Sequence, residues 1–309
     1  MYYFIVNPES RSGNGRHIWQ IAEDILEQED VEYRVFFTSC RFHAGKLAAE
    51  ITGRKERVVL VAVGGDGTVN EILNGIQDFS KVTFGYIPTG SSNDFARSLG
   101  LPTDTVQAIR NILHPSYFRR IDLGRAYLGE QQKYFAVSCG CGFDAAVCHE
   151  AVSSRMKGLL NKFHLGKLTY IGTALKQLIM LRPSPLKLVL DDGRSMVFRR
   201  TYFAAAMNCC FEGGGLKFCP AADAEDGFLD ICVVEGLSKA VIALLFPTAF
   251  YGLHRFFPGI HLFRVRSAEF YSSRRLPFHT DGEPYFLNKR VRIVCAPQKL
   301  TLIAGPRQP

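Results

Sequence analysis

The feature that most constrains this chain is the segment 57–63, which is apolar without interruption after Arg57 and is followed at once by the glycine-rich segment Gly64–Thr68. An apolar run without alternation is typical of a strand buried on both faces of a parallel sheet. The glycines predict a turn, and Val69–Ile76 has the apolar spacing of a helix. The same order of strand, loop and helix begins at Tyr2 and again at Val82. We therefore expect the first part of the chain to form an open α/β sheet.

After about Arg120 the pattern changes to strand-like segments joined by turns that contain glycine and aspartate. Examples are Leu186–Leu190, Met196–Asn208 and Leu229–Val234. This pattern predicts an antiparallel β domain, with helical insertions near 145–182 and 237–254. Because the join between the two parts lacks a flexible linker, we expect the two lobes to pack around a cleft.

Composition limits the partners that the chain can bind. The 309 residues carry a formal net charge of +8 with a pI near 9.0, which favours nucleic acid, nucleotide or an anionic lipid surface. Nucleic acid is the weakest of these three because the chain has no zinc finger, RNA-binding aromatic signature or long basic arm. The nine cysteines show no zinc spacing and are typical of buried thiols in a reducing compartment.

No segment of the sequence is expected to cross a membrane. The most apolar stretch, Ala240–Leu253, is interrupted by Pro247 and is shorter than the roughly 20 residues that a transmembrane helix requires. The first residues lack the features of a secretion signal, so a cytoplasmic location is expected.

Three polar loops follow the expected strands of the first part, namely Asn7–Gly13, Gly64–Thr68 and Pro88–Arg97. Open α/β sheets bind ligands outside the carboxyl ends of their strands, so these loops are expected to form a nucleotide site. Glycine lets backbone amides approach a phosphate closely. Asp66 either organises Mg²⁺ and water beside the nucleotide or caps a helix. A Walker A sequence is absent.

Four motifs in this order resemble the diacylglycerol kinase catalytic-domain family, and the resemblance covers about residues 2 to 304. They are an Asn-Pro-x-Ser turn at Asn7–Ser10, Gly64–Glu71, Pro88–Arg97 and Asp281–Glu283. The resemblance implies an N-terminal ATP-binding α/β domain and a C-terminal β-sandwich. The expected domains are 1–120, with a returning C-terminal strand within about 299–309, and 121–298.

By the same resemblance, the residues that contact ATP lie in the loops and at the start of the helix after the glycines. Asn93 and Asp94 are expected to support the phosphate and Mg²⁺. The serine of the first turn corresponds to either Ser10 or Ser12. The complete expected set is Asn7, Ser10, Thr38, Gly64, Gly65, Asp66, Gly67, Thr68, Asn70, Glu71, Thr89, Asn93 and Asp94.

The resemblance also implies a structural magnesium site and a catalytic base. Asp226 matches a side-chain ligand, whereas Asp223 and Phe228 match positions that bind largely through the backbone; without the family, this segment reads as a β-turn. Glu225 departs from the aspartate usual in the family. Glu283 matches the base that accepts the proton of a lipid alcohol, although its pattern alone indicates a hairpin turn.

The function implied is transfer of the ATP γ-phosphate to a lipid hydroxyl, with diacylglycerol the expected substrate. Other lipids stay open, as do an NAD kinase-like enzyme and a non-catalytic nucleotide- or lipid-binding protein. We expect a peripheral protein at the inner face of the cell membrane, and a homodimer is compatible with the sequence. Basic residues among apolar ones favour 155–182 as the membrane contact; the alternative is a solvated helix face.

Overall fold

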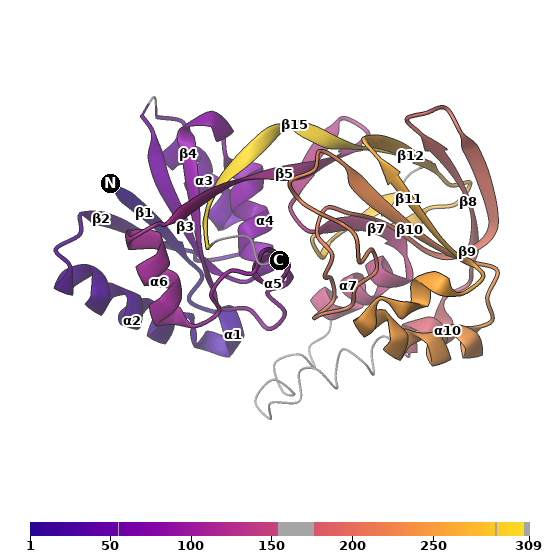
Figure 1. Ribbon diagram of the computed structural model, residues 1–309, viewed down its shortest axis with the longest axis horizontal. Helices are drawn as coiled ribbons and strands as arrows, with labels where there is room; N and C mark the ends of the chain where they lie inside the picture. The colour runs from indigo at the N-terminus through magenta and orange to yellow at the C-terminus, as the bar shows by residue number, and fades with distance from the viewer. Residues whose placement is uncertain (55, 154–175, 288, 306–309) are drawn as a thin grey trace. The chain divides into compact units, whose positions relative to one another are not determined.

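The computed structural model describes residues 1–54, 56–153, 176–287 and 289–305 (Figure 1). The chain divides into two compact units. The first unit contains Met1–Asp122 and Pro297–Pro309, and the second contains Leu123–Ala296. The division falls within two strands, β5 (Tyr117–Leu128) and β15 (Arg290–Ala304).

The first unit contains a parallel sheet with the strand order β15-β4-β3-β1-β2. The register of β1 to β4 is given by residue pairs such as Val6↔Phe37, Val6↔Val63 and Val63↔Ile87. Leu302 of β15 pairs with Phe84 of β4. The strand bounds are β1 (Tyr2–Val6), β2 (Tyr33–Phe37), β3 (Val58–Gly64) and β4 (Val82–Pro88).

Helices cover this sheet on both faces, which explains why its central strands are apolar without alternation. Phe4 and Val6 of β1 share a buried cluster with Trp19 of α2 (Gly15–Gln28) and Ile109 of α6 (Thr105–Leu113). The helices α3 (His43–Thr52) and α4 (Asp66–Gly75) pack against each other and contact β1 and β3. Two short helices, α1 (Ser10–Gly13) and α5 (Asp94–Leu99), follow β1 and β4, and the 3-10 turn η1 (Phe79–Lys81) precedes β4.

One boundary predicted from the sequence is wrong. The segment Gly64–Thr68 was expected to be a turn before a helix at Val69, but α4 begins at Asp66. Gly65, the last residue before the helix, is extended, with φ −100° and ψ −175°. The chain therefore turns within two glycines, and Asp66 already lies in the first helical turn.

The second unit is antiparallel and is organised around the long strand β9 (Ser195–Met207). The amino-terminal part of β9 pairs with β8, and its carboxyl-terminal part pairs with β7 and β10. The remaining order runs β14-β13-β7 on one side and β8-β12-β15 on the other, while β11 extends β10 and β6 pairs with β5. The bounds are β6 (Gln131–Phe135), β7 (Ser138–Gly142), β8 (Ser184–Leu190), β10 (Leu229–Glu235), β11 (Ile260–Val265), β12 (Ser267–Tyr271), β13 (Leu276–Thr280) and β14 (Glu283–Leu287).

The core of this unit is formed by alternate strand residues, among them Phe135, Leu188 and Phe270. Its helical segments are α7 (Phe143–Ser153), α10 (Lys239–Leu245), η2 (Phe246–Tyr251) and η3 (Leu253–Phe256). An α/β unit followed by a β-sandwich-like unit is the fold class expected from the sequence, which is confirmed.

Candidate functional site

The carboxyl ends of the parallel strands carry the first group of candidate residues. Backbone hydrogen bonds extend the ladder past the strand ends, from Asn7 N to Val63 O (2.8 Å), from Thr38 N to Val6 O (2.9 Å) and from Thr89 N to Gly64 O (2.7 Å). Because the strands are parallel, the residues after β1, β2, β3 and β4 lie along one edge of the sheet.

Side-chain hydrogen bonds then tie these loops to one another. Asn7 Nδ2 donates to Thr68 Oγ1 (3.2 Å), Ser10 Oγ donates to the Asn7 carbonyl (2.8 Å), and Thr89 Oγ1 donates to Ser10 Oγ (2.7 Å). Ser10, Thr68 and Thr89 are buried. The expected residues of three different loops therefore form one hydrogen-bonded group. The side chain of Ser12 lies outside the described part of the structure.

Two glycines bring the second and third loops into backbone contact. A Cβ atom placed on Gly90 would lie 2.8 Å from the Cα of Gly65 and 2.6 Å from Asn93 Oδ1. Real Cβ atoms essentially never approach other heavy atoms this closely, so no side chain fits at Gly90 without a shift of the backbone. The close approach of the two loops therefore depends on glycine at both positions.

Asp66 links the same two loops through its carboxylate. Oδ2 accepts the backbone N–H of Asp94 (3.0 Å) and Oδ1 accepts that of Phe95 (3.2 Å), so Asp66 caps α5. Asn93 precedes that helix with a left-handed backbone (φ 50°), and its Oδ1 accepts the Gly90 amide (2.8 Å). The cap interpretation of Asp66 thus holds, although the helix that it caps is α5.

Two carboxylates make this edge negative. Asp94 is buried, and the pKa of the neighbouring Tyr86 is raised well above its usual range by burial and by the charges of Asp66 and Asp94. Both side chains present carboxylate oxygens close to the glycine loops. These residues fit a hydrated Mg²⁺ ion, which prefers oxygen ligands and keeps several waters.

Asn70 and Glu71, two further residues of the expected nucleotide set, lie beyond the first turn of α4 and contact other residues. Glu71 accepts the backbone N–H groups of Phe42 (2.8 Å) and Ala44 (3.2 Å), so it caps the start of α3. Asn70 is buried, and Asn74 Nδ2 donates to its carbonyl (2.9 Å). The structure therefore brings the loop residues together but directs Glu71 toward α3.

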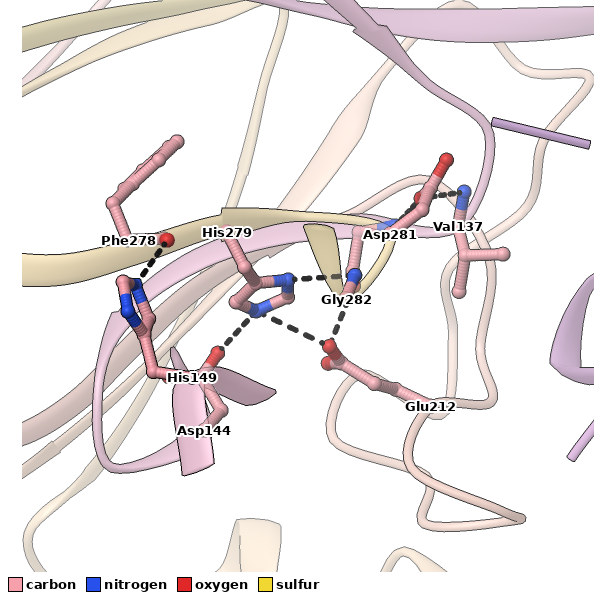
Figure 2. A network of polar contacts seen from close by, with 9 residues as sticks. Val137, Asp144, His149, Glu212, Phe278, His279, Asp281 and Gly282 are labelled. Carbon is pink, nitrogen blue, oxygen red and sulfur yellow. Dashed lines mark hydrogen bonds and ion pairs between the residues drawn. The ribbon is translucent and has the colours of Figure 1, made fainter. Parts of the chain in front are cut away.

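The second unit carries the expected base at the hairpin between β13 and β14. Asp281 and Gly282 form its tip with positive φ angles of 48° and 82°, and Glu283 is the first residue of β14. The Asp281 carboxylate accepts three consecutive backbone amides, those of Ala136 (2.8 Å), Val137 (2.8 Å) and Ser138 (3.0 Å). Asp281 thereby fixes the hairpin against the segment between β6 and β7 (Figure 2).

His279, two residues before this tip, lies in a buried polar network that the sequence did not indicate (Figure 2). Its Nε2 lies 2.7 Å from Asp144 Oδ2 and 3.4 Å from Glu212 Oε1, and Ser138 Oγ donates to the same Glu212 oxygen (2.6 Å). Burial lowers the pKa of His279. The charge of Asp144, its hydrogen bond and the charges of Glu212 and Asp281 outweigh burial and raise that pKa to about 9.

The hydrogen bond from the Gly282 amide is incompatible with a second proton on this imidazole, and also with a metal bound to it. It donates to His279 Nδ1 (3.2 Å), which requires a lone pair on that nitrogen. A protonated ring, or a neutral ring that binds a metal through Nε2, carries a hydrogen on Nδ1 instead. Asp144, Glu212 and His279 have ligand atoms within 4.8 Å of one another, yet a metal there would require the Gly282 amide to turn away. The hydrogen bonds therefore fit a neutral ring whose proton is on Nε2 and is donated to Asp144. The acidic neighbours that raise the pKa favour a second proton on Nδ1, and a ring that gains it must lose the Gly282 bond.

The expected magnesium ligands lie in the turn before β10. Asp226 Oδ1 accepts the Phe228 amide (2.8 Å), and Asp223 Oδ1 accepts the Glu225 amide (3.2 Å). Arg264 forms an ion pair with the other oxygen of Asp226 and lies over the Phe228 ring. The turn gathers carboxylate and carbonyl oxygens, which is the donor chemistry that Mg²⁺ prefers.

Comparisons with known proteins place this chain in a family. Residues 1–126 match the diacylglycerol kinase catalytic domain, and residues 137–304 match the YegS C-terminal NAD kinase beta sandwich-like domain. The Bacillus subtilis protein named "Putative lipid kinase YtlR" is 30% identical over 91% of this chain and 93% of its own length. A diacylglycerol kinase of Mycobacterium tuberculosis is 36% identical over 67% of this chain and 64% of its own.

A solved structure described as a "putative diacylglycerol kinase" from Bacillus anthracis has a TM-score of 0.76 at 22% identity. The match covers 99% of the present chain and 95% of the Bacillus anthracis chain, which supports the fold. The chain belongs to the family of lipid kinases with a diacylglycerol kinase catalytic domain. The resemblance inferred from four short motifs is confirmed. No helix in the described residues is long and apolar enough to span a bilayer.

Proposed function

We propose that this protein transfers the γ-phosphate of ATP, with Mg²⁺, to a lipid hydroxyl, and that diacylglycerol is the substrate. The observation that carries the proposal is the group of three hydrogen-bonded loops at one sheet edge. Asn7 joins Thr68, Ser10 joins Thr89, and Asp66 joins the start of α5. A glycine backbone at the start of α4 suits a polyphosphate, because no side chain of its own keeps the phosphate away from the helix start.

We assign nucleotide and Mg²⁺ binding to residues of the first unit, and the catalytic base to the second unit. Gly64, Gly65, Gly67 and Gly90 let the backbone approach the phosphates, while Asp66 and Asp94 are the residues that would hold nucleotide-bound Mg²⁺. When bound there, the ion would supply positive charge that neutralises the charge developing on the phosphoryl oxygens. Glu283 accepts the proton of the lipid hydroxyl as the hydroxyl attacks, and Asp281 and His279 hold the hairpin that presents Glu283.

Acceptor identity separates this proposal from an NAD kinase-like activity and from a non-catalytic binding protein. We expect label from γ-labelled ATP to appear in phosphatidate when diacylglycerol is supplied in mixed micelles, and to be absent from NAD. Monoacylglycerol, sphingoid bases, ceramide and phosphatidylglycerol complete the panel. Label in NAD alone would support the first alternative, and tight ATP binding without transfer to any acceptor would support the second.

A magnesium titration tests the turn at Asp223, Asp226 and Phe228. In the absence of nucleotide, Mg²⁺ at 100 times its dissociation constant is expected to stabilise the folded wild type by about 2.7 kcal/mol, seen as a rise in Tm. Asp226→Asn should lose this increment.

The matched control is Asp192→Asn, because Asp192 also lies in a turn and also pairs with an arginine, Arg194 (2.6 Å). Each variant loses an ion pair, so only the magnesium-dependent part of the Tm distinguishes them. An equal magnesium increment in Asp226→Asn and in the wild type would remove this turn from the list of metal sites.

Peripheral attachment to the inner face of the cell membrane, from a cytoplasmic location, is part of the same proposal because the substrate is a membrane lipid. Most of the basic segment 155–182 expected to make that contact lies outside the described residues. Lys176 and Arg182, which are described, are both exposed.

A further inference from the structure

An exposed apolar face lies on the second unit, formed by α10, η2 and η3, which contact one another in sequence. Residues 241–257 contain seven of the seventeen large hydrophobic side chains that are exposed in the described part of the chain. Leu244 (77% exposed), Tyr251 (78%) and Phe256 (69%) are the most prominent. The full set is Val241, Leu244, Phe250, Tyr251, Leu253, Phe256 and Phe257. A cluster of this kind on a protein surface marks an interaction site.

Hydrogen bonds hold the backbone of this face against the rest of the unit, so the fold itself keeps these side chains exposed. Ala249 and His254 are buried and point inward: the Ala249 carbonyl accepts the Lys217 amide (2.8 Å), and His254 Nε2 lies 3.0 Å from the Phe218 carbonyl. Ser238 caps α10 by accepting the Val241 amide (3.3 Å). The segment therefore presents its apolar side chains on one side while its other side is anchored to the unit.

Charge around the face selects one kind of partner. No aspartate or glutamate occurs between Glu235 and Glu269, whereas Lys239 and Arg255 lie within the face. The Arg255 guanidinium lies over the Phe256 ring, 4.7 Å from its centroid. Lys239 donates to the carbonyl of Ile179, whose own side chain is 72% exposed. Apolar and aromatic side chains in a segment whose only charged residues are basic match the interface of an anionic bilayer.

We propose that the α10–η3 face, residues 239–257, inserts into the surface of an anionic lipid bilayer. The inference rests on the proposed lipid-kinase function, since it places the membrane that holds the substrate against this unit. A second copy of the chain fits less well, because a two-fold contact through this face would bring its basic groups together without acidic partners.

Vesicle sedimentation of the full chain tests this proposal, with vesicles of phosphatidylcholine and phosphatidylglycerol. Leu244→Ser/Phe256→Ser is expected to reduce the vesicle partition coefficient by about tenfold or more, because two apolar side chains no longer enter the interface. The matched control is Phe118→Ser/Val197→Ser, whose side chains are 57% and 64% exposed outside the face. It should bind as the wild type does. Tyr251→Ser provides a second variant that leaves the buried core untouched.

Several results would overturn the inference: no binding of the wild type, equal binding by the face variant, or an equal loss in the control. A change of the wild type from dimer to monomer in the face variant, with vesicle binding unchanged, would assign the face to a second copy. Kinase failure is distinguished by a separate readout. If the kinase proposal is wrong, no variant phosphorylates a short-chain diacylglycerol in monomeric solution. If only the membrane role of the face is wrong, the face variant phosphorylates vesicle-bound substrate as fast as the wild type does, and the two proteins are also equal on monomeric substrate.

Discussion

Replacing Glu283 by glutamine is expected to lower kcat by about 10²- to 10⁴-fold, the usual cost of losing a general base. Glutamine keeps the size of the side chain but cannot accept the proton as a carboxylate. ATP affinity should stay within about twofold of the wild type, because in phosphoryl transfer positioning of the nucleotide and removal of the proton are separate tasks. Calorimetry for ATP and turnover on diacylglycerol micelles measure the two quantities.

The control is Glu130→Gln, a neutralised glutamate at an exposed turn of the same unit. It should leave both quantities unchanged. Near-normal turnover in Glu283→Gln would remove Glu283 from the mechanism and leave the nucleotide loops unaffected. A loss of ATP affinity equal to the loss of turnover would show that Glu283 acts on nucleotide binding.

Replacing Gly90 by valine is expected to weaken ATP binding by about 5- to 150-fold, which corresponds to an overpacking cost of about 1–3 kcal/mol. The new Cβ would lie 2.8 Å from the Cα of Gly65, so the two loops must separate. That separation strains the bonds from Asp66 to the amides of Asp94 and Phe95. Equilibrium titration with ATP measures the effect.

Gly305→Val is the control, because a Cβ at Gly305 meets no heavy atom within 4 Å. The free energy of unfolding of both variants separates loss of the site from loss of the fold. Normal ATP affinity in a folded Gly90→Val variant would contradict the account of the glycine loops.

The sheet edge could be predicted from the sequence because each loop follows directly on an apolar strand. Strand order in α/β sheets and the parallel direction then bring Asn7, Asp66 and Thr89 to one edge without further information. The start of α4 could not be predicted in the same way. A glycine pair reads as a turn, and only the extended conformation of Gly65 allows the helix to begin at Asp66.

The network around His279 was missed because its members are far apart in the chain. The histidine and Asp144 are separated by 135 residues, and neither stands in a recognisable ligand spacing. The one available signal was the position of His279 two residues before Asp281, within the motif that carries Glu283.

Glu71 belongs to a family motif, yet the contacts that the structure shows for its side chain stabilise another helix. Its carboxylate accepts two amides at the start of α3, 29 and 27 residues away along the chain. A motif read along one segment does not indicate such a cap on another helix. The role of Glu71 toward the nucleotide therefore stays a prediction, whereas its contact with α3 is observed.

The central claim is that ATP is consumed by phosphorylation of a lipid hydroxyl. The most direct measurement is the ratio of ADP formed to phosphatidate formed, with purified protein, diacylglycerol micelles and Mg²⁺. The account predicts one phosphatidate for each ADP, no product after chelation of the metal, and both products reduced together in Glu283→Gln. ADP released without phosphatidate, or a product formed on NAD in its place, would contradict it.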